Sequence, residues 1–304
     1  MSRPSYADLP APVKDWVTAT LGSPVVTAHS QPGGFSPGVA ARVICASGRR
    51  AFVKAASAAV NADTPGMHRA EAHNTRLLPA AAGAPELLGC YDEDGCVALI
   101  FEEVAGRPPH LPWSDDDLGA ALRALDRLSD VPGPGGLPSA EQRLGDTFGR
   151  WALLAVDPPH DLLPWQRAHL ADLVAMEAGW QQAVRGDRLL HVDARSDNML
   201  VRLDGEVTLI DWPHAATGAA VLDVIGFLPS AVLEGAGDPD GLLLRTRAGG
   251  EADADLVTTL VACMCGYLEH SARKPAPPGI GTVRAFQAAQ ARAAGDWLRR
   301  RTGW

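Results

Sequence analysis

The chain has 304 residues and a formal net charge of −9, with 46% hydrophobic and 21% charged residues. This length suffices for one large domain or two smaller lobes with substantial cores, and the composition is that of an ordinary globular protein. The acidic balance argues against nucleic-acid binding, because that binding depends on Lys and Arg contacts to phosphates.

The cysteines and the hydropathy pattern predict a cytoplasmic protein. The five cysteines form an odd, irregularly spaced set without a CxxC pair, so we expect reduced thiols and no zinc site. Cys263 and Cys265 lie in an apolar helical stretch, where free cysteine behaves as a small buried hydrophobe. The N-terminus lacks the apolar core of a signal peptide, and no later segment is long and apolar enough to span a bilayer.

The first hundred residues predict a β-rich region with one inserted helix. After a short helix at 11–21, strands are expected at 25–29, 40–46, 50–55, 86–91 and 96–102. Thr64 and Pro65 provide an N-cap and a first helical proline for a helix that continues to about Leu78. The Gly-Arg-Pro-Pro segment at 106–109 predicts a hinge.

Beyond this hinge the pattern is mainly helical. Helices are expected at 115–129, 140–156, 164–184, 218–230, 251–271 and 281–300, with short β segments at 189–192 and 199–210. Ser114 with Asp117, and Ser139 with Gln142, have the spacing of capping boxes. We therefore expect an α+β fold with a β-rich lobe at 1–104, a mainly helical lobe at 105–304, and a ligand site between them.

The strongest functional pattern begins at His191. The segment His191-Val192-Asp193-Ala194-Arg195-Ser196-Asp197-Asn198 fits the H-x-D-x-x-x-x-N catalytic loop of kinases, and Asp211 follows after a predicted hairpin. A carboxylate can accept the proton of an acceptor hydroxyl as the O–P bond forms. Oxygen ligands such as those of Asn198 and Asp211 suit Mg²⁺. A single Asp or Asn is more often a turn residue, so the prediction depends on the joint pattern.

A second element is the strand that ends in Ala51-Phe52-Val53-Lys54. It matches the strand lysine that contacts the α- and β-phosphates in kinase-type sites, and Glu71 on the next helix is its expected partner. Taken singly, Lys54 would be read as a solvated strand-end charge and Glu71 as an ordinary helix residue. Their order before the catalytic loop favours the functional interpretation.

Two weaker elements complete the predicted nucleotide site. The turn that contains Gly33, Gly34, Phe35 and Ser36 could bring backbone N–H groups close to phosphates, although a glycine-containing hairpin turn explains it nearly as well. The segment 99–106 resembles the one whose backbone contacts the adenine edge in kinase-type folds, and this resemblance implies that role for main-chain groups near Glu102 and Val104.

These motifs together resemble the aminoglycoside phosphotransferase family over about residues 22–271. That family typically has His-Gly-Asp at the catalytic loop and Asp-Trp or Asp-Phe after the hairpin. The resemblance implies a bilobal protein-kinase-like fold in which Asp193 is the catalytic base, Asn198 and Asp211 hold magnesium, and Asp223 braces the loop. Val192 replaces the usual Gly, and Arg195 stands where many relatives have His.

The resulting functional prediction is an ATP- or GTP-dependent phosphotransferase acting on a small-molecule hydroxyl. The carboxylates and Trp residues of the C-terminal lobe favour an acceptor that is cationic or sugar-like. Family analogy adds an aminoglycoside or another antibiotic as the acceptor, and a role in antibiotic resistance. Trp151, Trp165, Trp180 and Trp212 are offered as acceptor platforms, although helical Trp is more often core. The alternatives are a nucleotide-binding pseudokinase that acts through partner contacts, and nucleotidyl transfer.

Overall fold

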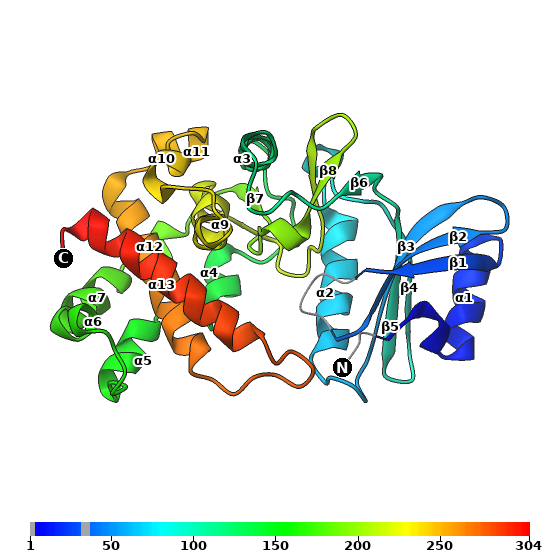
Figure 1. Cartoon of the computed structure of the whole chain (residues 1–304), viewed down its shortest axis with the longest axis horizontal. Coiled ribbons are helices and arrows are strands. Elements are labelled where there is room, and N and C mark those ends of the chain that lie inside the picture. Colours follow the sequence, from blue (N-terminus) through cyan, green and yellow to red (C-terminus); the bar gives the residue numbers. More distant parts are fainter. Residues whose placement is uncertain (1–3, 32–36) are drawn as a thin grey trace.

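The computed structural model describes residues 4–31 and 37–304, which form two lobes (Figure 1). The N-terminal lobe is built on a five-stranded antiparallel sheet in the order β1-β2-β3-β5-β4. Its elements are the helices α1 (Ala11–Leu21) and α2 (Thr64–Leu77), the 3₁₀ turns Tyr6–Asp8 and Ala80–Ala82, and the strands β1 (Val25–Ser30), β2 (Val39–Cys45), β3 (Arg50–Ser57), β4 (Leu87–Glu93) and β5 (Cys96–Glu102). The predicted strands are confirmed to within two residues at each end.

The two faces of this sheet are covered by different helices. Alternate side chains of β5 point to opposite sides, because successive Cβ atoms of a strand do so. Ala98 and Ile100 pack in the cluster that includes buried residues of α1, whereas Leu99 and Phe101 pack with Ala72 of α2. The sheet therefore lies between α1 and α2 (Figure 1), and α2 lies on the side that faces the second lobe.

The start of α2 differs from the prediction. Asp63, not Thr64, is the N-cap residue, and Asp63 makes no side-chain capping hydrogen bond. Instead Asn61 Oδ1 accepts hydrogen bonds from the backbone N–H groups of Asp63 and Thr64 and from Thr64 Oγ1, each at 3.0 Å. A buried side chain two residues upstream thus satisfies donors that a helix start leaves unpaired.

The segment predicted as a hinge is partly a strand. Gly106 and Arg107 form β6 (Gly106–Arg107), which pairs with β8 (Met199–Arg202), and β8 pairs with β9 (Val207–Leu209). Gly106 is required here, because a Cβ at this position would lie 2.8 Å from the Val201 carbonyl oxygen. The link between the lobes is therefore fixed to the hairpin that precedes Asp211.

The C-terminal lobe is mainly helical, with a large core under α9, α12 and α13. It contains α3 (Asp115–Ser129), α4 (Ala140–Leu144), α5 (Arg150–Val156), α6 (Pro164–Ala168), α7 (Leu170–Glu177), α8 (Trp180–Ala183), β7 (Arg188–Leu190), the 3₁₀ turn Ser196–Asn198, β10 (Ala216–Gly218), α9 (Val221–Leu233), α10 (Pro239–Leu243), α11 (Arg247–Glu251), α12 (Ala254–Ala272) and α13 (Val283–Thr302). Trp151 and Trp212 are 0% and 1% exposed within this core, so both are structural. The expected α+β fold, with a β-rich lobe followed by a mainly helical lobe, is confirmed.

Two of the predicted helices are divided. The 140–156 prediction separates into α4 and α5, because Gly149 has a φ of +80° and Glu177 accepts the N–H groups of Gly149, Arg150 and Trp151 at 2.7–3.0 Å. The 164–184 prediction separates into α6, α7 and α8. A buried carboxylate far along the chain thus begins α5, and no local sequence signal reports it.

The two predicted capping boxes have different outcomes. Ser139 and Gln142 form both hydrogen bonds of the box at α4. Ser114 caps α3, but the Asp117 carboxylate binds the Arg107 guanidinium at 2.7 and 2.9 Å and the His110 N–H at 2.8 Å instead. Because Asp117 binds Arg107 of β6, its side chain does not bind the Ser114 backbone N–H. The capping box predicted for Ser114 and Asp117 is therefore wrong.

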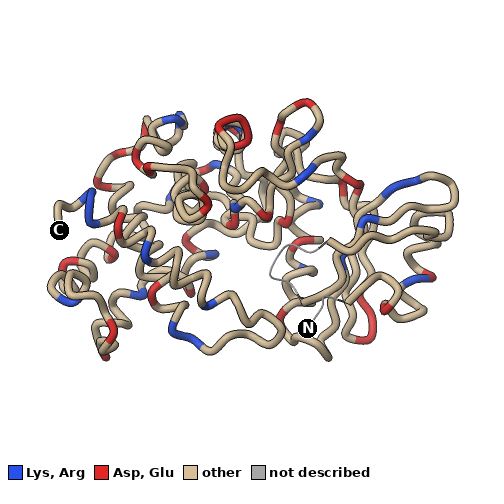
Figure 2. The backbone as a smooth tube through the Cα atoms, in the orientation of Figure 1, with Lys and Arg blue, Asp and Glu red and all other residues tan. Residues whose placement is uncertain are grey.

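The remaining bulk predictions concern thiols, charge and membranes. All five cysteines are free, and Cys263 and Cys265 are buried. Acidic and basic residues are interspersed over both lobes (Figure 2). Within the two described ranges, no helix is both long and apolar enough to cross a membrane.

Candidate active site

The predicted lysine, glutamate and aspartate meet where the two lobes face each other. Lys54 Nζ on β3 lies 2.9 and 2.8 Å from the two carboxylate oxygens of Glu71 on α2. The same nitrogen lies 2.7 Å from Asp211 Oδ1, just after β9. Three segments separated by up to 157 residues are thereby joined by one ammonium group.

The environment of these three groups keeps Lys54 charged. Burial disfavours its ammonium form, but the carboxylates of Asp211 and Glu71 outweigh burial and raise the pKa of Lys54. Burial also raises the pKa of Glu71, whose side chain is almost wholly enclosed. Burial acts in the same direction on Asp211, yet the charge and hydrogen bond of Lys54 lower the pKa of this carboxyl. Asp211 is therefore ionised. Its side chain is 38% exposed, so the carboxylate is accessible to a metal ion.

Helix α2 also positions the chain that follows Asp211. Asn74, one turn after Glu71, donates from Nδ2 to the carbonyls of Trp212 and Pro213 at 2.9 and 3.0 Å. Asp211 itself has a φ of +69°, a conformation that Asp tolerates better than most residues. The sequence analysis missed Asn74, although its i+3 spacing from Glu71 places both on one face of the helix.

The catalytic-loop motif is held from beneath by Asp223 of α9. Its buried carboxylate accepts the backbone N–H groups of His191 and Val192, both at 2.7 Å. His191 Nε2 contacts the Ile210 carbonyl at 2.9 Å, so the loop is also tied to the residue before Asp211. Val192 has a φ of +68°, which is strained for a β-branched residue and which Gly would adopt without strain.

The Asp193 carboxylate has a partner on each oxygen. Arg195 donates to Oδ1 at 2.8 Å, and Asn198 Nδ2 donates to Oδ2 at 3.0 Å and to the Asp193 carbonyl at 2.8 Å. Arg195 also forms two hydrogen bonds with Asp197, at 3.0 and 3.1 Å. The Asp193 side chain is 28% exposed, so it is oriented by its neighbours and still accessible.

The residues predicted to hold magnesium present suitable atoms. Because Asn198 donates from Nδ2, its Oδ1 is the free atom, and no described residue donates to that oxygen or to Asp211 Oδ2. Two protein oxygens suit Mg²⁺, which commonly keeps several waters and binds phosphates as well. The donor set therefore fits a magnesium–nucleotide ion.

The weaker predicted nucleotide contacts are placed only in part. Gly33, Gly34, Phe35 and Ser36 lie outside the described residues. The next glycine, Gly38, approaches β3 so closely that a Cβ there would lie 2.2 Å from the Ala55 carbonyl oxygen. Glu102 ends β5, where its N–H donates to Glu86, and Val104 lies in the link before β6.

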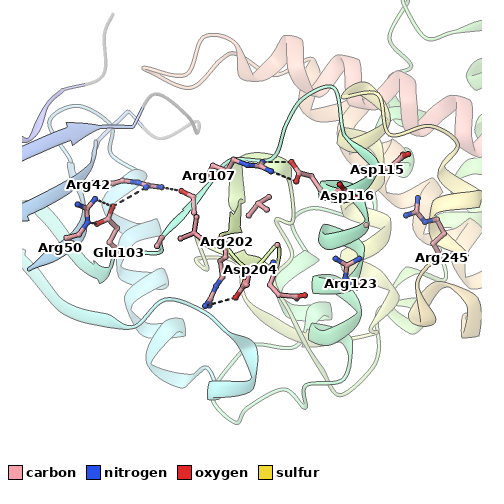
Figure 3. A pocket seen from close by; sticks show the side chains of 18 residues that line it. Arg42, Arg50, Glu103, Arg107, Asp115, Asp116, Arg123, Arg202, Asp204 and Arg245 are labelled. Atoms are coloured by element: carbon pink, nitrogen blue, oxygen red, sulfur yellow. Dashed lines mark hydrogen bonds and ion pairs between the residues drawn. The ribbon is translucent and has the colours of Figure 1, made fainter.

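A cavity of about 1100 Å³ lies beside this link, between β2, β3, α3 and the β8–β9 hairpin (Figure 3). Two ion pairs lie in its wall: Arg50 binds Glu103 at 2.6 and 3.0 Å, and Arg107 binds Asp117. The described residues that line it include neither Lys54 and its two carboxylate partners nor Asp193 and the residues that bind it. We therefore interpret the ion pairs in the wall of this cavity as contacts that stabilise the link between the lobes.

The comparisons with known proteins concern the family and the fold. The sequence matches the family model described as "APH: Phosphotransferase enzyme family" over residues 31–257. No curated protein matches the sequence.

Three similar solved structures illustrate the fold. Aminoglycoside phosphotransferase APH(4)-Ia, in a complex with ADP and hygromycin B, is 19% identical with a TM-score of 0.57, covering 96% of this chain and 99% of that one. Choline kinase LicA from Streptococcus pneumoniae is 12% identical with a TM-score of 0.60, covering 95% and 98%. A putative fructosamine-3-kinase from Haemophilus somnus 129PT is 13% identical with a TM-score of 0.59, covering 95% and 96%.

The family match covers most of the chain, and the similar structures share its bilobal fold. On these findings, the chain belongs to the phosphotransferase enzyme family.

Proposed function

We propose that this protein transfers the γ-phosphoryl group of ATP or GTP to a hydroxyl of a small molecule. The observation that carries the proposal is the 2.7 Å ion pair between Lys54 of the N-terminal lobe and Asp211 of the C-terminal lobe. It brings a phosphate-binding cation and an ion-binding carboxylate together within reach of the Asp193 loop.

In this proposal residues 1–104 bind the nucleotide. Lys54, held by Glu71, contacts the α- and β-phosphates, and backbone N–H groups of Gly33, Gly34, Phe35 and Ser36 approach the phosphates. Main-chain atoms of Glu102 and Val104 meet the adenine edge. The ADP in one similar structure, an aminoglycoside phosphotransferase, supports a nucleotide in this fold.

Residues 105–304 supply the chemistry and the acceptor site. Asp193 orients the acceptor hydroxyl and accepts its proton while the acceptor oxygen bonds to the γ-phosphorus and the bond from that phosphorus to the leaving nucleoside diphosphate breaks. Arg195 and Asn198, one on each carboxylate oxygen, hold Asp193 in place. Asn198 and Asp211 hold Mg²⁺, which when bound neutralises charge on the phosphate oxygens.

Family analogy alone would make the acceptor a sugar-like hydroxyl compound such as an aminoglycoside or another antibiotic. Two observations support a small molecule. One similar structure is a complex with hygromycin B, and others are a choline kinase and a putative fructosamine-3-kinase.

The five free thiols support a cytoplasmic setting.

The test is mass spectrometry of the purified protein with magnesium, ATP or GTP, and a panel of hydroxyl compounds. A mass gain of one phosphate on one compound, absent with D193N, is the expected result; D193N should bind nucleotide normally and turn over about 10²–10⁴-fold more slowly. D172N, a variant of an exposed aspartate that pairs with His169, is the matched control. Nucleotide binding without hydrolysis or transfer on any compound would instead indicate a pseudokinase.

A further inference from the structure

One basic side chain near the catalytic loop is half-buried and has no counterion among the described residues. Arg143 lies on α4, and its Nε is enclosed with no hydrogen-bond partner. Its guanidinium makes no hydrogen bond or ion pair with the part of the chain that the structure describes. Arg195, by contrast, is bound by two carboxylates. An enclosed donor such as Arg143 Nε is costly when it has no acceptor, and a bound anion would supply one.

The fold places Arg143 on the acceptor side of the catalytic loop. Helix α4 is anchored to β10, since Ser139 bridges Thr217 and the Thr217 N–H donates to the Pro138 carbonyl at 2.9 Å. Strand β10 begins two residues after His214, which itself follows the Asp211–Pro213 segment. In Figure 1, α4 lies below the catalytic region, between α2 and α13.

His214 connects Arg143 to the catalytic loop electrostatically. Burial lowers the pKa of His214, and the Arg143 charge lowers it further, while the carboxylates of Asp193 and Asp211 oppose this change. Burial alone lowers the pKa of Arg143 itself, with no described carboxylate offsetting it. The nearby acids are already engaged, because Asp211 binds Lys54 and Asp193 binds Arg195. The charges of Arg143 and Asp193 thus both act on His214, and no described carboxylate pairs with Arg143.

We propose that Arg143, with His214 next to it, binds an anionic group of the acceptor, so that the substrate is a small hydroxyl compound carrying a carboxylate or a phosphate. This inference rests on the proposed phosphoryl transfer to a small-molecule hydroxyl. The planar guanidinium matches both anions with paired N–H donors. A polycationic acceptor would bring ammonium groups against Arg143, so this proposal replaces the cationic expectation drawn from family analogy.

The first experiment measures phosphorylation of acceptors in matched pairs. The pairs are glycerate and glycerol, gluconate and sorbitol, and glycerol 3-phosphate and glycerol, with hygromycin B as the cationic member. Phosphorylation restricted to carboxylates or to phosphates supports the proposal and identifies the anion. Preference for a neutral or cationic member would overturn it.

The variants separate acceptor binding from nucleotide binding. R143Q should raise KM for the anionic acceptor about 10- to 100-fold, as expected for loss of one charge-assisted contact, and leave KM for ATP unchanged. R143K should recover part of the loss. R185Q removes an exposed arginine that lies after α8 and pairs with Glu141 of α4, and it is the control that should change neither KM. If R143Q weakened ATP alone, Arg143 would be a nucleotide ligand and the proposal wrong.

A binding measurement decides the case if no panel member is phosphorylated. Inorganic phosphate and glycerate should raise the melting temperature of the wild type and of R185Q, compared with chloride at equal ionic strength, and should not raise that of R143Q. Equal shifts in all three proteins would overturn the anion site. If no assay showed nucleotide turnover, while the anions still raised the melting temperature of the wild type and not of R143Q, the proposed transfer reaction would be refuted instead.

Discussion

Asn61 of the N-terminal lobe donates from Nδ2 to the carbonyl of Pro278 at 3.0 Å, and so ties the start of α2 to the loop between α12 and α13. The same loop approaches the N-terminal lobe at a second residue, Pro37. A Cβ added to Gly279 would lie only 2.9 Å from the Cβ of Pro37. Figure 1 shows this loop running from α12 toward the N-terminal lobe before α13 begins. Asn61 therefore serves both a helix start and a contact between lobes.

Substitutions at Asn61 should separate its two roles. N61D keeps Oδ1 for the N–H groups at the start of α2 but removes the donor to Pro278, so hydrogen exchange should quicken in residues 273–282 without a large loss of stability. N61A removes both, and should also cost about 1 kcal/mol of unfolding free energy through the lost cap. Hydrogen exchange and thermal denaturation measure the two effects. Unchanged exchange in N61D would show that the Pro278 contact does not hold the loop.

Replacing Lys54 should affect both nucleotide binding and stability. K54M leaves the buried Glu71 without its cation, and breaking one half of such a pair costs about 3–5 kcal/mol. K54M/E71Q should regain much of that stability while nucleotide affinity stays low. Denaturant unfolding and calorimetric nucleotide titration provide the readouts, with K14M of an exposed lysine as the control. Normal nucleotide affinity in K54M would remove Lys54 from the site.

Asp211 should make nucleotide binding depend on magnesium. Wild-type affinity for ATP should fall when magnesium is removed with a chelator, whereas D211A should bind ATP equally weakly with and without the ion. D204A, on the hairpin before Asp211, removes an exposed carboxylate that pairs with Arg202 and accepts the Glu206 N–H, and it should keep the wild-type response. Tight magnesium-dependent binding by D211A would contradict the assignment.

The strained backbone at Val192 predicts a reversed order of two substitutions. Gly normally destabilises a site by about 0.5–1 kcal/mol relative to Ala, because it loses more entropy on folding. At a φ of +68° an L side chain costs about 1–2 kcal/mol, so V192G should be at least as stable as V192A. Val156, which is exposed on α5, offers the comparison: there V156A should be more stable than V156G. Denaturant midpoints of the four variants measure this, and the usual order at 192 would mean that Val192 is unstrained in solution.

The local sequence predicted most elements, and the reasons for its errors are nonlocal. The boundaries of β5 and α1 follow from hydrophobic pattern and turn residues close by. The division at Gly149 depends on the Glu177 carboxylate, and the redirected Asp117 depends on Arg107 of β6, whose pairing with β8 no local pattern reveals. Asn61 and Asn74 were missed for a related reason, since a single Asn is usually a turn or surface residue.

The sequence by itself determined the order of the motifs, from Lys54 and Glu71 through Asp193 and Asn198 to Asp211, because each lies in a short segment with its own spacing. Only the tertiary structure decided their relations: that one ammonium group joins Glu71 to Asp211, that Arg195 and Asn198 each hold one oxygen of Asp193, and that Arg143 is left without a counterion. Distances between side chains far apart in sequence follow from how helices and sheets pack. Charge compensation depends on those distances, so it cannot be read from a linear chain.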